Sequence, residues 1–206
     1  SKGVSSNIIY IILIVPFLAC LATLARQILG ISIFGIYTPV IIAISFFILG
    51  IKLGIATFIF AVFIGYIVKY ILNKFELLYT PKVALNLSII SLSFLAVIWL
   101  ALQYGTSVPL SMAIFPMLVM STVSEKFMAA QNEEGVRSAL LAVAGTLFIV
   151  ITSYYLVTWP YFNNLLLSWP ELVLIPVVLT LLLGKFTGLR LAEYMRFRSL
   201  LSEHQE

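Results

Sequence analysis

The sequence predicts an all-α integral membrane protein: a bundle of seven transmembrane helices with its N-terminus outside and its C-terminus inside. Three observations lead to this fold class. Of the 206 residues, 62% are hydrophobic and only 10% are charged, which is far from the composition of a soluble domain. Apolar runs long enough to cross a hydrocarbon core of about 30 Å recur along the chain. Finally, Lys and Arg lie in the connections between these runs, with a strong bias to one side.

The first three spans are expected over 7–27, 36–50 and 53–72 within a single domain, 1–200. The first contains Pro16, which a membrane helix tolerates because its neighbours re-satisfy the freed carbonyl. Glycines and Pro39 mark a structured bend from Gly30 onward, and the second span, which follows it, is short. A tight link from Gly50 to Gly54 then turns the chain back.

The fourth and fifth spans are expected over 81–104 and 108–130. Pro81 suits the first turn of the fourth. Asn86, Ser88, Ser91 and Ser93 are expected to face other helices.

The last two spans are expected over 133–159 and 171–194, followed by a polar tail, 201–206. Asn132 is the predicted N-cap of the sixth span, where Glu133 and Glu134 would meet the positive end of the helix dipole. The connection over 160–170 carries Tyr161, Phe162 and Trp169, aromatic residues typical of the membrane interface.

Orientation follows from the positions of the twelve Lys and Arg residues. With seven spans and an outer N-terminus, Lys2 and Lys52 lie outside. The other ten lie inside: Arg26, Lys69, Lys74, Lys82, Lys126, Arg137, Lys185, Arg190, Arg196 and Arg198. The positive-inside rule favours this arrangement, and an even number of spans would destroy it.

Several functional classes find little support in the composition. Cys20 is the only cysteine and His204 the only histidine, so no multi-histidine metal site and no intrachain disulfide is expected. The chain has no Asp, which counts against a retinal protein with a carboxylate counter-ion and against a proton-coupled pump. The hydroxyl side chains have no His or Lys base at a plausible spacing. We therefore expect no catalytic, cofactor-binding or nucleic-acid-binding residues.

The charged residues expected on the inner side form a predicted cytoplasmic contact face, and Glu125 is its most informative member. Glu125 could form an ion pair with Arg26, Arg137 or Arg190, or it could receive a group from a partner or ligand. The full face comprises Arg26, Glu125, Arg137, Arg190, Glu193, Arg196 and Arg198. The last four alternate with apolar residues such as Leu189 and Phe197, a pattern that suits a helix lying along a membrane surface or docking a protein.

Gly184 and Gly188 lie four residues apart on one helical face. Such a pair permits close approach of a second helix. We expect close packing within the bundle, with dimerisation as the alternative.

Several motifs resemble a known bacterial family. They are the bend Gly30-x-x-x-Phe34-Gly35-x-x-Thr38-Pro39, the pair Phe115-Pro116 followed by Glu125 and Glu133-Glu134-Gly135, and the closing segment Gly184-Lys185-Phe186-Thr187-Gly188-Leu189-Arg190 with Glu193-Tyr194-x-Arg196-Phe197. Together they resemble the seven-transmembrane domain found fused to inactive transglutaminase-like domains. The resemblance covers essentially the whole chain.

The resemblance implies an upstream membrane anchor and a periplasmic transglutaminase-like domain in the same chain. The opening Ser-Lys-Gly, without Met, agrees with the expectation that a larger protein continues upstream. The resemblance also implies association with cytosolic ATP-grasp glutamate ligases and a bacterial inner membrane. It assigns no catalytic residue.

The leading functional hypothesis is a non-enzymatic membrane module that couples or scaffolds a periplasmic domain and a cytosolic partner, with membrane lipids around it. The alternative is a transporter or receptor for a small peptide or amino-acid-like ligand. The hydroxyls and prolines of the fourth and fifth spans motivate this alternative, because breaks in membrane helices can expose backbone to a substrate.

Overall fold

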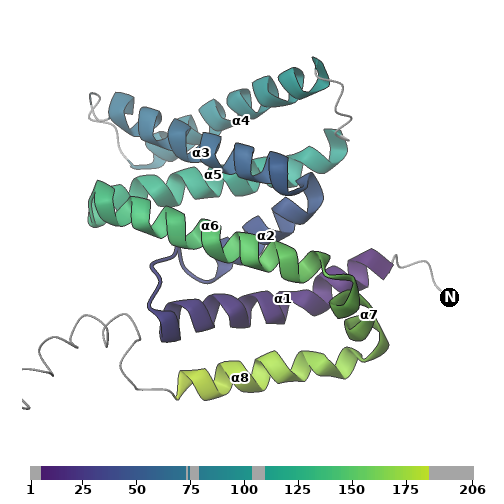
Figure 1. Cartoon of the computed structure of the whole chain (residues 1–206). Coiled ribbons are helices and arrows are strands. Elements are labelled where there is room, and N and C mark those ends of the chain that lie inside the picture. The colour runs from purple at the N-terminus through teal and green to yellow at the C-terminus, as the bar shows by residue number, and fades with distance from the viewer. Residues whose placement is uncertain (1–5, 73, 75–78, 104–109, 186–206) are drawn as a thin grey trace, which may run out of the picture. The chain divides into compact units, whose positions relative to one another are not determined.

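The computed structural model describes residues 6–72, 74, 79–103 and 110–185, and every element in this part of the chain is helical (Figure 1). The helices are α1 (Ser6–Leu24), the π-helix η1 (Ala25–Leu29), α2 (Tyr37–Leu49), α3 (Ile51–Leu72), α4 (Tyr79–Gln103), α5 (Leu110–Glu133), α6 (Val136–Thr158), α7 (Pro160–Ser168), the 3-10 helix η2 (Pro170–Val173) and α8 (Leu174–Gly184). The chain forms two compact units: Ser1–Val40 with Gly145–Glu206, here unit 1, and Ile41–Ala144, here unit 2.

Within the described residues, three helical segments are long and apolar enough to cross a membrane: Ile9–Leu29, Ile51–Ile71 and Val136–Thr158. A fourth crossing is possible if α7 and the segment Pro170–Gly184 together form one span, although they are bent by 105°. The apolar segments Tyr37–Leu49 and Pro81–Ala96 are shorter. These helices are those of a multi-pass membrane protein, while the count of seven crossings and the orientation remain predictions.

In unit 1, the bend after η1 packs against α6. The backbone N–H of Phe34 donates a hydrogen bond to the Thr146 hydroxyl at 3.2 Å. A Cβ on Gly145 would clash with the backbone carbonyl oxygen of Ser32. The absence of a side chain at Gly145 therefore lets the bend lie directly on the helix.

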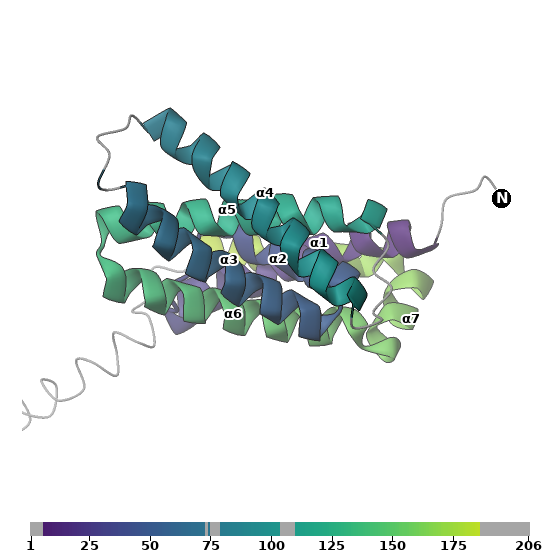
Figure 2. The same ribbon diagram turned by 90° about the horizontal axis from the view of Figure 1, so that it is seen from above.

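Unit 2 is built around α3, α4 and α5, which lie against one another (Figures 1 and 2). A buried cluster of Ile64, Val68, Ile90 and Met128 joins the three helices. α2 and α3 meet through Phe46 and Phe58, two fully buried rings in an edge-to-face arrangement with centroids 6.5 Å apart. Apolar burial and close helix packing thus hold the unit together.

The boundary between α5 and α6 lies elsewhere than the sequence predicted. Asn132 and Glu133 are in the last turn of α5, and α6 begins only at Val136. Between them Gly135 has φ +89°, a left-handed conformation that glycine adopts without steric cost and that commonly ends a helix. The Gly135 carbonyl accepts the N–H of Ala139 as the first bond of α6. The prediction that Asn132 caps the sixth span is therefore wrong.

The segment predicted as a connection over 160–170 is itself mostly helical. Pro160 occupies the first turn of α7, where its missing N–H and fixed φ are favourable. Phe162 anchors this helix to α1 through an edge-to-face contact with Phe17, with centroids 5.2 Å apart. Trp159, Tyr161 and Trp169 are exposed around α7. The chain then bends sharply into α8, as Figure 1 shows.

Close packing at Gly184 is not found within the described residues. A Cβ on Gly184 would meet no atom within 4 Å, so this glycine does not serve a close helix contact there. Gly188 lies outside the described residues.

Candidate functional site

The predicted cytoplasmic contact face is only partly described. Arg26 is exposed in η1 and belongs to unit 1. Glu125 is half-buried within α5, and Arg137 is exposed in the first turn of α6, both in unit 2. Arg190, Glu193, Arg196 and Arg198 lie outside the described residues. The face as a whole therefore stays a prediction.

Within unit 1, the helical segment that α1 and η1 form together is tied to two other helices by hydrogen bonds at its two ends. The Tyr10 hydroxyl donates to the carbonyl of Val157, near the C-terminus of α6, at 2.6 Å. At the other end, Gln27 Nε2 donates to the carbonyl of Leu183, in the last turn of α8, at 2.8 Å. The last carbonyls of a helix have no partner within the helix, so α1 satisfies one such group on each neighbour.

These two bonds, together with the course of the chain in Figure 1, give the relative directions of the three helices. The N-terminal part of α1 meets the C-terminal end of α6, so the two helices are antiparallel. The C-terminal end of α1 meets the C-terminal end of α8, so those two are parallel. The tyrosine and glutamine carry no recognisable motif, and sequence reasoning did not single them out.

The end of unit 1 where Gln27 contacts Leu183 is positively charged. Arg26 precedes Gln27, Lys185 follows Leu183 by two residues, and both cationic side chains are exposed. The π-helical turn is relevant here, because π-bulges are frequent at functional sites. The sequence indicated Arg26 and Lys185 as inner-side charges but not that they share one end of a unit.

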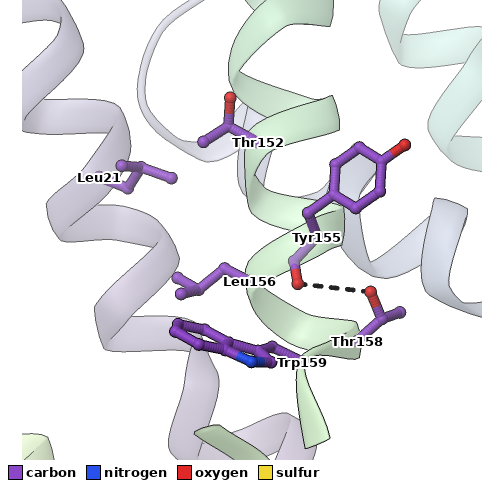
Figure 3. A pocket seen from close by; sticks show the side chains of 6 residues that line it. All are labelled: Leu21, Thr152, Tyr155, Leu156, Thr158 and Trp159. Carbon is purple, nitrogen blue, oxygen red and sulfur yellow. Dashed lines mark hydrogen bonds between the residues drawn. The ribbon is translucent and has the colours of Figure 1, made fainter.

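A hollow of about 510 Å³ lies on unit 1 between α1 and the C-terminal part of α6 (Figure 3). It is lined by Leu21, Thr152, Tyr155, Leu156, Thr158 and Trp159. The hydroxyls of Thr152 and Thr158 donate to backbone carbonyls of α6 at 2.9 Å and 2.8 Å. These two threonine hydroxyls are thus paired, and most of the wall surface is apolar.

Unit 2 contains a buried polar contact between α4 and α5. The Ser124 hydroxyl donates to Asn86 Oδ1 at 2.9 Å, and both residues are almost fully buried. The prediction that Asn86 faces another helix is confirmed, whereas Ser88 is exposed and bonds to the Ala84 carbonyl of its own helix. Among the described residues, Asn86 Nδ2 and Gln131 Nε2 are buried without a hydrogen-bond partner.

Metal-ligating and thiol side chains complete the description of the polar groups. No group of three or more His, Cys, Asp or Glu that could hold a metal occurs within the described residues. Cys20 is buried and unpaired.

Comparison with known proteins gives one family. The family is described as "7 transmembrane helices usually fused to an inactive transglutaminase", and its sequence model matches residues 4–201. No curated protein and no solved structure matches the chain. The match covers nearly the full length, in agreement with the apolar helices of both units, and the chain therefore belongs to the family of seven-transmembrane domains usually fused to an inactive transglutaminase.

Proposed function

We propose that this chain is a non-enzymatic module of the bacterial inner membrane that couples a periplasmic transglutaminase-like domain to a cytosolic partner. The usual fusion of the family to an inactive transglutaminase supports a role in holding or relaying rather than in catalysis. In this proposal the N-terminus of the domain is outside and the cytoplasmic contact face is inside. A cytosolic ATP-grasp ligase is the proposed partner.

The observation that carries the proposal is the pair of bonds made by the two ends of α1. Tyr10 holds the start of α1 to α6, and Gln27 of η1, which continues α1 directly, holds the other end to the last turn of α8. Lys185 and the predicted basic segment follow α8 directly. If an attached periplasmic domain displaced α1, the bond from Gln27 to Leu183 would move the end of α8 with it. The predicted basic segment, which follows α8, would then move as well.

The hollow in Figure 3 suits an apolar chain better than an amino-acid-like solute, because most of its wall is apolar and its two threonine hydroxyls are already bonded to backbone. α5 also continues unbroken through Pro116. A transport function through a broken fifth helix therefore gains no support from these features.

The first test is affinity capture of the full-length protein from its own membranes in mild detergent, with mass spectrometry of the proteins that co-purify. We expect a cytosolic ligase to be retained and to be lost when Arg190, Arg196 and Arg198 are replaced by Ala together. Replacement of Lys2 and Lys52 by Ala provides the control, because both lie outside in the proposed topology. If the unmodified protein, the triple Arg variant and the double Lys variant inserted equally and captured the ligase equally, the proposed docking face would be wrong.

Orientation can be tested separately, since Cys20 is the only cysteine of the chain and is buried. Lys52→Cys and Arg137→Cys each add a thiol at an exposed position. In intact spheroplasts, a membrane-impermeant maleimide should label the Lys52→Cys protein, and it should label the Arg137→Cys protein only after lysis. The reverse pattern would contradict the proposed orientation.

A further inference from the structure

The cationic end of unit 1 lies beside a second hollow, between α1 and α8. This hollow has a volume of about 290 Å³ and is lined by Pro16, Ala19, Pro176, Val177, Thr180 and Leu181. The Thr180 hydroxyl donates to the Pro176 carbonyl at 2.7 Å, so its polar group is already satisfied. The small side chain of Ala19 and the compact proline rings leave space that neither helix fills.

Two cations lie beyond one end of this hollow. The bond from Gln27 Nε2 to the Leu183 carbonyl holds the ends of α1 and α8 together, so Arg26 and Lys185 lie at the same level along the helix pair. With a rise of 1.5 Å per residue, Arg26 is about 10 Å beyond Ala19, and Lys185 is about 6 Å beyond Leu181. The two cations therefore lie within about one to two helical turns of the end of the apolar hollow.

We propose that this part of unit 1 binds one anionic glycerophospholipid, with its phosphate at Arg26 and Lys185 and one acyl chain in the hollow between α1 and α8. The guanidinium and the ammonium are both phosphate-binding groups. An acyl chain in the hollow restores dispersion contacts that its lining would otherwise lack. An anionic lipid matches both features, because it carries a negative headgroup next to an apolar chain.

The site goes beyond the proposed coupling function and does not depend on it. It would place the lipid against the bond between Gln27 and Leu183, where α1 meets the end of α8. Anionic lipid would then stabilise the joined ends of these two helices. Juxtamembrane Lys and Arg residues each contribute modestly to such binding.

The test uses the full chain in dodecyl maltoside, titrated with dioleoyl phosphatidylglycerol or dioleoyl phosphatidylcholine and followed by native mass spectrometry. We expect one phosphatidylglycerol to bind in preference to phosphatidylcholine. Arg26→Gln and Lys185→Gln should each weaken phosphatidylglycerol binding about fivefold, and the double variant about 25-fold. Lys126→Gln is the matched control, because it removes an exposed cation from unit 2, outside the contact face, and should leave binding unchanged.

The hollow is tested by filling it. Ala19→Leu should reduce binding of the dioleoyl lipid, and Leu181→Trp, which fills the hollow from the α8 side, should do the same. Ala56→Leu is the control, because it adds the same side chain at an exposed position of α3. Glycerol 3-phosphate, which has the headgroup phosphate but no acyl chain, should compete poorly.

Three results would overturn the proposal. One is equal binding of the two lipids by the unmodified protein. Another is an unchanged affinity in the double Arg26→Gln and Lys185→Gln variant. The third is a dimer of the chain without bound lipid that Ala19→Leu dissociates, which would show that a second copy occupies the groove.

Discussion

Gly65 is the position where the structure makes its sharpest prediction about stability. A Cβ added there would lie 2.5 Å from Ser124 Oγ and 3.3 Å from both the Cβ and the carbonyl oxygen of the same residue. Ordinary carbon contacts are about 3.5–4.0 Å. In Gly65→Ala, either α3 and α5 must move apart or the Ser124 hydroxyl must rotate away.

The expected cost follows from three terms. Overpacking of a well-packed core costs about 1–3 kcal/mol. Rotation of Ser124 also loses its 2.9 Å bond to Asn86, and a bond between membrane helices contributes about 0.6 kcal/mol on average. Ala gains up to about 1 kcal/mol over Gly in a helix interior. We therefore expect Gly65→Ala to lower the free energy of unfolding by about 0.6–2.6 kcal/mol.

The assay is unfolding by SDS titration of the protein in mixed micelles, followed by far-ultraviolet circular dichroism. Gly184→Ala is the matched control, because its new Cβ would meet no atom of the described residues within 4 Å, and its effect should stay within about 0.5 kcal/mol. In the double variant with Gly65→Ala and Ser124→Ala, the closest clash is gone. The double variant should therefore lose less free energy of unfolding than the two single variants lose together. If Gly65→Ala matched Gly184→Ala in stability, the close contact between α3 and α5 would be refuted.

Two further predictions concern unit 1. Gly145→Ala should destabilise the protein more than Gly65→Ala, because the clash is with the Ser32 backbone carbonyl rather than with a rotatable hydroxyl. Limited proteolysis should then cut the bend over 30–36 faster than in the unmodified protein, and unchanged cleavage would count against the contact. Tyr10→Phe removes the 2.6 Å bond to the Val157 carbonyl and should cost about 0.6–1.7 kcal/mol. SDS titration of this variant beside Tyr66→Phe, which alters an exposed tyrosine of α3, separates loss of the bond from loss of a hydroxyl alone.

The sequence predicted an all-helical membrane protein and the family to which it belongs, and both predictions are confirmed. Long apolar runs can satisfy their backbone groups in lipid as helices, so composition and run length suffice for that conclusion. Asn86 illustrates a prediction that also reached a tertiary contact. A buried amide within an apolar helix favours a polar partner on a neighbouring helix, and the Ser124 hydroxyl donates to its oxygen, Asn86 Oδ1.

Other features were beyond the reach of the sequence. At the junction of α5 and α6, Asn132 and the two following acids form an acceptable start for a helix, yet Gly135 ends the preceding helix and sets the boundary. In the segment 160–170, aromatic residues indicated an interface but not whether the backbone was helical. The contact from Gly145 to Ser32 joins residues more than a hundred positions apart and leaves no local signal.

By itself the sequence determined that this protein lies in a membrane and that its apolar runs are helical, because both properties depend on hydrophobicity summed over short stretches, while the bias of its cations to one side stays a prediction. Only the tertiary structure decided which polar groups meet. In the sequence, nothing distinguishes Tyr10 of α1 and Gln27 of η1. In the structure, they donate hydrogen bonds to carbonyls near the ends of α6 and α8. Such pairings depend on the directions and packing of helices distant in the sequence, and local composition does not encode these.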